Sequence, residues 1–212
     1  SKAVHDVQEA LRHHPKLPLV LLGFSAGGLV ALQLAERFWF QPVSAVLCEG
    51  LFLQSPSLVR RAYPMLLRLQ RKHFSPEKWQ DTAARKLLYS PSEVSASCRT
   101  AEWDARPRVP AVTRAALLGL DDFRRETIDL LEHRRLQCPV FLAHGQRDPS
   151  SSIAATEKLA AKLMSERSDS ELLLMSRSAH SLALGPESRI YSDWALRCIN
   201  RAVDRCALSK NC

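Results

Sequence analysis

A serine stands at the centre of a turn whose sequence suits nucleophilic chemistry. The string Gly23-Phe24-Ser25-Ala26-Gly27 follows an apolar run at residues 19–22 and precedes a helical run at residues 29–37. A sharp strand-to-helix turn holds a serine hydroxyl in an exposed, strained position, and small neighbouring residues let the backbone pack closely there. Backbone N–H groups at the start of the helix favour negative charge. The turn therefore predicts a nucleophile beside a place for the oxyanion that it generates.

An acid and a base occur later in the chain, each directly after an apolar, strand-like run. Asp148 follows the run at residues 139–144, and His180 follows the run at residues 171–175. In parallel α/β sheets the carboxyl ends of the strands meet at one edge, where ligands bind. The order serine, acid, histidine thus places three groups of complementary acid–base chemistry at one edge of a predicted sheet.

The elements that must position these groups alternate between strands and helices. Strand-like runs at residues 19–22, 43–48, 139–144 and 171–175 are accompanied by helical patterns at residues 1–14, 29–37, 152–165 and 186–207. A helix between consecutive strands makes the strands parallel, with right-handed crossovers. We therefore predict an α/β protein with a three-layer α/β/α core around a parallel sheet.

Residues 51–137 interrupt this alternation. The segment is helical in pattern and rich in proline, and Asp121-Asp122 has the character of a helix start. We expect an inserted helical cap here, between a first core part at residues 1–50 and a second core part at residues 138–212. Apolar cap residues either line an acyl pocket or pack against the core, and the sequence leaves both readings open. These residues are Tyr63, Met65, Leu66, Leu67, Leu69 and Phe74.

Composition narrows the class of protein. The 212 residues suffice for one sizeable core, and no apolar run approaches the ~20 residues that span a bilayer. The formal net charge of +8 comes with arginines scattered over helical stretches without aromatic interleaving. We therefore expect neither a membrane span nor a nucleic-acid partner. The six cysteines are spread out and no pair of histidines has metal-site spacing, which favours a reducing, cytoplasmic compartment and no metal or cofactor.

The three polar groups and their order resemble the α/β-hydrolase superfamily. Gly23-Phe24-Ser25-Ala26-Gly27 is similar to its nucleophile elbow, His144-Gly145-Gln146-Arg147-Asp148-Pro149 to its acid loop, and Ala179-His180 to its histidine loop. The resemblance implies a serine hydrolase that cleaves an ester, thioester or small amide of a small-molecule acyl substrate through an acyl-enzyme. It further implies that Ser25 attacks the acyl carbon, His180 moves the proton, Asp148 holds the imidazole, and the N–H of Ala26 contributes to the oxyanion hole.

The family pattern is incomplete in this chain. In the superfamily further strands precede the nucleophile strand, and a loop after one of them supplies the second oxyanion donor. No such strand precedes residue 19 here. We therefore expect only the C-terminal strands of the superfamily's sheet, with residues 19–22 as an exposed apolar edge, and the chain as a fragment of a complete hydrolase. The oligomeric state stays open.

Other readings of the same residues remain. A non-catalytic α/β-hydrolase-like binding protein, or an inactive fragment, is the alternative function, although a binding protein has no need of all three polar groups. Transacylation would use the same groups. Asp148 could cap the helix that begins near Ser150, and Glu49 is a second candidate for the acid because it also ends a buried strand. His144 is expected to pack within its loop.

Overall fold

Four parallel strands form one sheet in the order β1-β2-β3-β4. The computed structural model describes residue 9 and residues 17–37, 43–54 and 114–209. The strands are β1 (Leu19–Phe24), β2 (Val43–Glu49), β3 (Val140–Gly145) and β4 (Glu171–Met175). The helices are α2 (Ala26–Arg37), α6 (Arg114–His133), α7 (Ile153–Glu166) and α8 (Ser188–Ser209).

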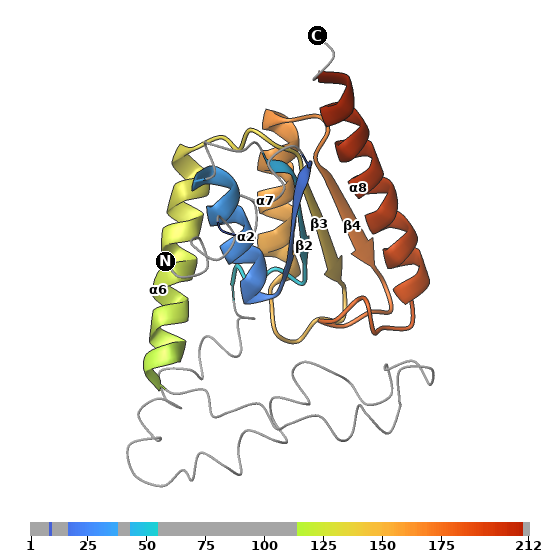
Figure 1. Ribbon diagram of the computed structural model, residues 1–212. Coiled ribbons are helices and arrows are strands. Elements are labelled where there is room, and N and C mark those ends of the chain that lie inside the picture. Colours follow the sequence, from blue (N-terminus) through green and yellow to red (C-terminus); the bar gives the residue numbers. More distant parts are fainter. Residues whose placement is uncertain (1–8, 10–16, 38–42, 55–113, 210–212) are drawn as a thin grey trace, which may run out of the picture.

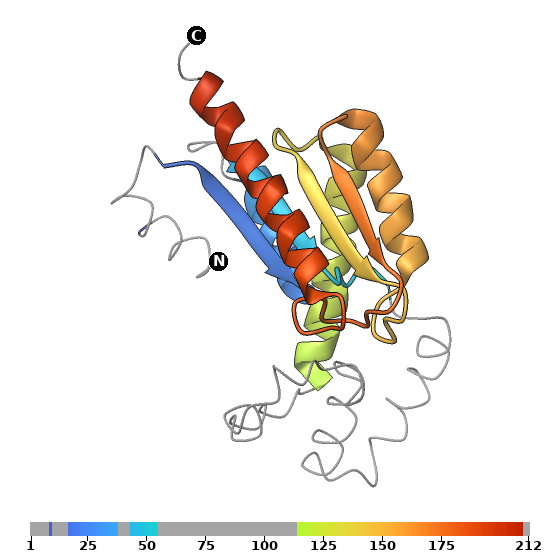
Figure 2. The same ribbon diagram turned by 90° about the vertical axis from the view of Figure 1, so that its right-hand side faces the viewer.

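The sheet lies between two helical layers (Figure 1). Helices α2, α6 and α7 cover one face and α8 covers the other, which Figure 2 shows from the side of α8. Alternate residues of β2 face opposite layers: Val46 and Cys48 join the cluster formed with α2 and α6, whereas Ala45 and Leu47 pack with α8. This arrangement confirms the predicted three-layer α/β/α architecture.

The position of each strand in the sheet explains its composition. β2 and β3 are buried along their whole length, because they lie inside the sheet and helices cover both of their faces. Such strands have continuous apolar sequences instead of alternating ones. β1 pairs only with β2 among the described residues, and Leu22 and Phe24 are 65% and 40% exposed. The apolar surface predicted for this edge strand is therefore present in the described part of the fold.

The predicted insertion at residues 51–137 is described only at its two ends. Residues 55–113, which include the candidate pocket residues, lie outside the described residues, as does nearly all of the predicted helix at residues 1–14. Helix α6 begins at Arg114, so the prediction that Asp121-Asp122 starts this helix is wrong.

Helix α6 packs against α2 on the sheet. The side-chain amide of Gln33 donates a 3.0 Å hydrogen bond to the hydroxyl of Thr127, and both side chains are buried. Leu131 and Leu136 join the same apolar cluster as Val46. The C-terminal end of the predicted insertion thus contributes to the core.

Two buried cysteines behave as apolar side chains. Cys48 in β2 and Cys138 before β3 are 0% and 3% exposed. Burial raises the pKa of Cys48 to about 12 and that of Cys138 to about 11, so both thiols stay protonated at neutral pH. Among the described helices, none has the length and apolar character that crossing a membrane requires.

Candidate active site

Ser25 lies between β1 and α2 in a strained backbone conformation. Its φ is 53°, and no other non-glycine residue in the described ranges has a positive φ. Its N–H donates a 2.8 Å hydrogen bond to the carbonyl oxygen of Glu49 at the end of β2. Its own carbonyl oxygen accepts from the N–H of Gly28 at 3.1 Å. The turn is therefore held both by its own helix and by the neighbouring strand.

The close backbone approach at this turn depends on Gly23 and Gly28. A Cβ on Gly23 would lie 2.5 Å from the Cα of Gly28, and a Cβ on Gly28 would lie 2.6 Å from Cδ1 of Leu51. A Cβ on Gly27 would meet nothing within 4 Å among the described residues. Among the described residues, a side chain at Gly23 would therefore clash with backbone atoms and one at Gly28 with the side chain of Leu51, whereas one at Gly27 would meet nothing.

Asp148 and His180 meet at the carboxyl ends of β3 and β4. Oδ2 of Asp148 accepts a hydrogen bond from Nδ1 of His180 at 2.7 Å, and the two side chains are 1% and 0% exposed. This bond assigns the proton of a neutral imidazole to Nδ1 and leaves Nε2 as an acceptor. Nε2 is buried and has no hydrogen-bond partner in the described part of the chain, which is rare for a buried polar atom. An acceptor in this state can serve as a general base.

The surroundings of Asp148 keep its carboxylate ionised. Burial opposes ionisation, but hydrogen bonds from His180, Ser151 and Ser150 and the charge of His180 outweigh it, so the pKa of Asp148 lies below its usual range. The hydroxyl of Ser151 donates to Oδ2 at 2.6 Å, and the N–H of Ser150 donates to Oδ1 at 2.7 Å. Ser152 is the N-cap of α7, so Asp148 does not cap that helix. Its Oδ1 accepts from backbone N–H groups of the loop, and its Oδ2 accepts from the hydroxyl of Ser151 and from His180.

A second histidine lies behind this pair. His144 is fully buried, with Nε2 3.3 Å from Oδ2 of Asp148 and Nδ1 3.0 Å from the hydroxyl of Thr156. Burial lowers the pKa of His144 in spite of the attraction of Asp148, so the ring is neutral at neutral pH. His144 therefore packs within its loop, as the sequence predicts, and contacts the acid.

Two groups hold the ring of His180 from the side of β1 and β2. Gly50 follows β2 with a φ of 56°, and a Cβ there would lie 3.2 Å from Nδ1 and Cε1 of the ring. The ring of Phe24 packs against the imidazole with 5.0 Å between centroids and an angle of 58° between planes. The residue before Ser25 and the residue after β2 thus both contact the histidine.

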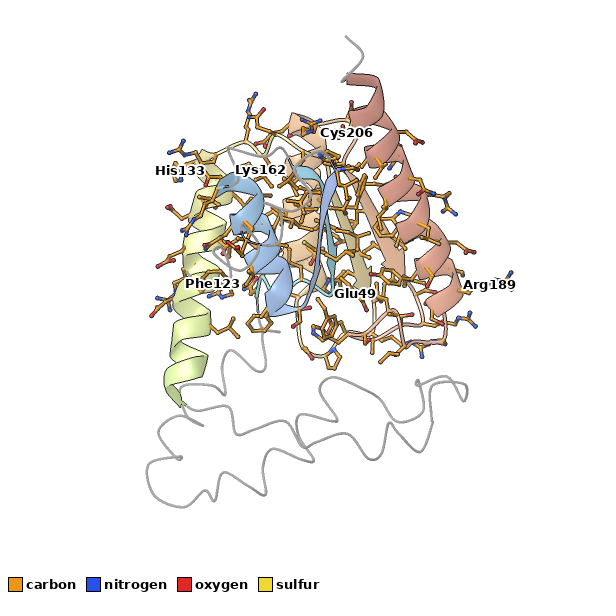
Figure 3. All side chains as sticks on the ribbon, viewed as in Figure 1. Glu49, Phe123, His133, Lys162, Arg189 and Cys206 are labelled. Atoms are coloured by element: carbon orange, nitrogen blue, oxygen red, sulfur yellow. The ribbon has the colours of Figure 1, made fainter. Side chains whose placement is uncertain are left out.

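The carboxylate of Glu49 binds the backbone of the histidine loop. Its Oε1 accepts from the N–H groups of Leu182 at 2.5 Å and Ala183 at 3.0 Å. The side chain of Tyr191 is also hydrogen-bonded to it, and burial together with this carboxylate raises the pKa of Tyr191. Figure 3 shows Glu49 at the carboxyl end of the sheet, whereas Arg189 on α8 points outward. Sequence reasoning missed these contacts, because 133 positions separate Glu49 from Leu182.

The ends of β1, β3 and β4 lie at the same edge of the sheet. Among the three candidate catalytic residues, only two are joined by a hydrogen bond. Asp148 and His180 are joined, whereas Nε2 of His180 has no bond from Ser25. Ala26 is the first residue of α2, so its N–H has no acceptor within the helix and lies at the positive end of the helix dipole. Within the described ranges, no group of three or more His, Cys, Asp or Glu side chains could hold a metal ion.

Solved structures with this fold include lipases and esterases. A monoacylglycerol lipase from Paleococcus ferrophilus is 18% identical, with 92% of this chain and 74% of that chain covered and a TM-score of 0.63. A soluble variant of monoglyceride lipase from Saccharomyces cerevisiae is 17% identical over 95% of this chain and 68% of that chain, with a TM-score of 0.65. An esterase from Exiguobacterium antarcticum is 14% identical over 94% and 72%, with a TM-score of 0.58.

Sequence comparison identifies the family. No curated protein matches the chain. The family model described as "Serine aminopeptidase, S33" matches residues 1–187, which is most of the sequence. Together with the parallel sheet and its helical layers, this match shows that the chain belongs to the S33 serine aminopeptidase family of α/β hydrolases.

Proposed function

We propose that this protein is a serine hydrolase that cleaves a carboxylic ester through an acyl-enzyme, with Ser25 as nucleophile, His180 as base and Asp148 as the acid that orients the base. The observation that carries the proposal is the buried imidazole of His180, which binds Asp148 through Nδ1 at 2.7 Å and has no partner on Nε2 among the described residues. The strained turn at Ser25, with a φ of 53°, supports the choice of nucleophile.

In the first half-reaction, Oγ of Ser25 attacks the acyl carbon while Nε2 of His180 accepts the hydroxyl proton. The former carbonyl oxygen carries the negative charge of the tetrahedral intermediate, and the N–H of Ala26 donates to it. When the intermediate collapses, the bond to the leaving alcohol breaks and the alcohol takes the proton from Nε2. The product of this step is an ester between Ser25 and the acyl group.

In the second half-reaction, water replaces the alcohol. Nε2 of His180 takes a proton from the water, and the water oxygen attacks the acyl-enzyme carbon. Collapse of this second intermediate breaks the bond to Oγ of Ser25, which recovers the proton from Nε2, and a carboxylic acid leaves. The ionised Asp148 stabilises the imidazolium in both steps, since their contact lies in a buried, weakly screened environment.

Esters are the substrates that we propose first. The solved structures with this fold include proteins named as lipases and an esterase, and an apolar acyl group suits a helical cap. The description of the family names an aminopeptidase, so small amides and thioesters belong to the proposed substrate class as well. In each case the attacked atom is an acyl carbon of a small molecule.

The direct test is labelling of the intact protein with a fluorophosphonate probe. We expect the wild-type protein to be labelled on Ser25, identified by mass spectrometry of the modified peptide, and Ser25→Ala to lose labelling. The matched control is Ser165→Ala, because Ser165 is exposed on α7 and its hydroxyl bonds only to the nearby carbonyl oxygen of Lys162 among the described contacts.

Two outcomes would contradict the proposal. Labelling that persists in Ser25→Ala would place the nucleophile elsewhere. A protein that binds an acyl ligand, yet neither reacts with the probe nor hydrolyses generic esters, would be the non-catalytic binding protein instead.

A further inference from the structure

We infer that Glu49 is a positioning residue that couples the nucleophile turn to the histidine loop, and that it acts through the reach of its side chain and not through its charge. The inference rests on the proposed function, because it assigns the geometry that Ser25 and His180 need. Glu49 ends β2, which lies between the strand that leads to Ser25 and the strand before Asp148.

The backbone of Glu49 holds the nucleophile turn. Its carbonyl oxygen accepts the 2.8 Å hydrogen bond from the N–H of Ser25, and Glu49 is also the register partner of Phe24 in the parallel ladder. Because Ser25 has a φ of 53°, the turn needs external contacts to stay in this conformation. The end of β2 supplies one of them at the serine itself.

The side chain of Glu49 holds the histidine loop. One carboxylate oxygen accepts from two successive N–H groups, those of Leu182 and Ala183, which follow His180 by two and three positions. Glu49 is 8% exposed and Leu182 is 0% exposed, so water does not readily replace these bonds. The two hydrogen bonds can form only because the side chain is long enough to reach these N–H groups, and they set the path of the backbone just after the histidine.

The next residue extends the same contact to the ring. A Cβ on Gly50 would lie 2.7 Å from the carbonyl oxygen of His180 and 3.2 Å from its ring, so the backbone at the end of β2 approaches the imidazole too closely to leave room for a side chain. Glu49 and Gly50 together therefore contact Ser25 on one side and His180 on the other. A displacement of either contact changes the separation of Oγ and Nε2.

Glu187 provides a useful comparison. It is also 8% exposed and also binds the histidine loop, since it accepts from the N–H of Arg177 and the hydroxyl of Ser178, both at 2.9 Å. Its partners precede His180, and Glu187 begins the approach to α8 instead of ending a strand beside Ser25. Glu187 therefore supports the loop alone, whereas Glu49 supports both the loop and the turn.

The test separates reach from charge with two substitutions. Glu49→Gln keeps the length and an acceptor oxygen but loses the charge, whereas Glu49→Asp keeps the charge but is one methylene shorter. For the intact protein we expect Gln to keep the rate of fluorophosphonate labelling within about threefold, and Asp to slow it by about 10- to 100-fold, since catalysis is sensitive to misplacement of about 1 Å. The loss should appear in kcat for a generic ester, with KM nearly unchanged.

Hydrogen exchange provides a readout that does not depend on activity. The amides of Leu182 and Ala183 should exchange faster in Glu49→Asp and remain protected in Glu49→Gln. Thr127→Val is the control for a loss of stability, because it removes a buried hydrogen bond between α2 and α6, remote from the histidine loop. We expect this variant to label at the wild-type rate.

Three results would overturn the inference while leaving the proposed function intact. The first is an active Asp variant with an inactive Gln variant, which would assign the role to charge. The second is an equal labelling rate in both variants although the amides of Leu182 and Ala183 exchange faster in the Asp variant. The third is unchanged exchange of these amides in the Asp variant. A folded wild-type protein that does not label would instead overturn the proposed function, on which the inference rests.

Discussion

Nδ1 of His180 donates a 2.7 Å hydrogen bond to Oδ2 of Asp148, although 32 positions separate the two residues in the sequence. Both side chains are almost completely buried, so the bond is shielded from water. It determines which nitrogen of His180 carries the proton and therefore which nitrogen can accept one. Substitutions that change this bond should change reactivity more than stability.

The first prediction concerns the acid. Asp148→Asn puts a neutral amide beside Nδ1, and an amide N–H donated to that nitrogen would move the ring proton to Nε2, where it blocks the general base. We expect kcat/KM for a generic ester to fall on the order of 10³- to 10⁴-fold, as the loss of the acid does in other triads. Circular dichroism should show an unchanged fold.

Ser151→Ala is the matched control for Asp148→Asn. It removes one hydroxyl donor from Oδ2, at 2.6 Å, but leaves the carboxylate and the bond from His180 in place. We expect a much smaller loss of kcat/KM than in the Asn variant. Near wild-type turnover by Asp148→Asn would show that another group orients the histidine.

The second prediction concerns the two adjacent glycines of the nucleophile turn. Gly27→Ala adds a Cβ that meets no described residue within 4 Å, in the first turn of α2, where alanine is the better helix former by up to ~1 kcal/mol. Gly28→Ala places a Cβ 2.6 Å from Leu51 and 3.3 Å from Sγ of Cys48, which should cost about 1–3 kcal/mol of unfolding free energy. Urea denaturation of the two variants measures the difference. Equal stabilities would refute this account of the turn.

The third prediction concerns pH. The pKa of His144 lies below its ordinary value of 6.5, because burial and the charge of His180 outweigh the attraction of Asp148 and Glu157. Below that value the unfolded chain binds a proton that the folded chain does not. The stabilisation by neutral His144 is therefore complete above about pH 6.5 and is lost as pH falls toward the lower, folded pKa, with a slope of at most about 1.4 kcal/mol per pH unit.

His144→Gln isolates this contribution, because glutamine does not titrate. Between pH 7.5 and pH 5.5, the unfolding free energy of the wild-type protein should fall by more than that of the variant. The depressed pKa of Asp148 affects this window little, since its stabilisation is present above the unfolded pKa of ~3.9 and is lost only at lower pH. Parallel curves for the two proteins would show that His144 is not kept neutral by the fold.

The strands of the sheet could be predicted because the signal for each of them lies within its own short run of sequence. Strands buried on both faces have continuous apolar sequences, and these marked β2 and β3 in the sequence. The predicted run at residues 171–175 coincides with β4. The start of α6 was not predictable in the same way. Asp121 resembles a capping residue, but in the structure its carboxylate accepts from Arg124 and Arg125 within a helix that is already formed.

The candidate site also has one part that the sequence predicts and one part that it does not. Placing Asp148 and His180 after strands required only the pattern of the sequence, and the structure joins them by a hydrogen bond. The partners of Glu49 depend on which loop crosses the end of β2, a property of the whole fold that no local pattern records. Likewise, Gly27 belongs to the sequence motif and Gly28 does not. It is nevertheless Gly28 that faces Leu51, because of its position around the axis of the helix.

The backbone at Ser25 also has an evolutionary consequence. Glycine adopts a φ of 53° without the steric penalty that serine incurs, so glycine would give a more relaxed turn at this position. The penalty for a side chain in the left-handed region is roughly 1–2 kcal/mol, a sizeable part of the marginal stability of a domain. Under the proposed function, selection for reactivity retains a hydroxyl at a position where selection for stability alone would favour its removal.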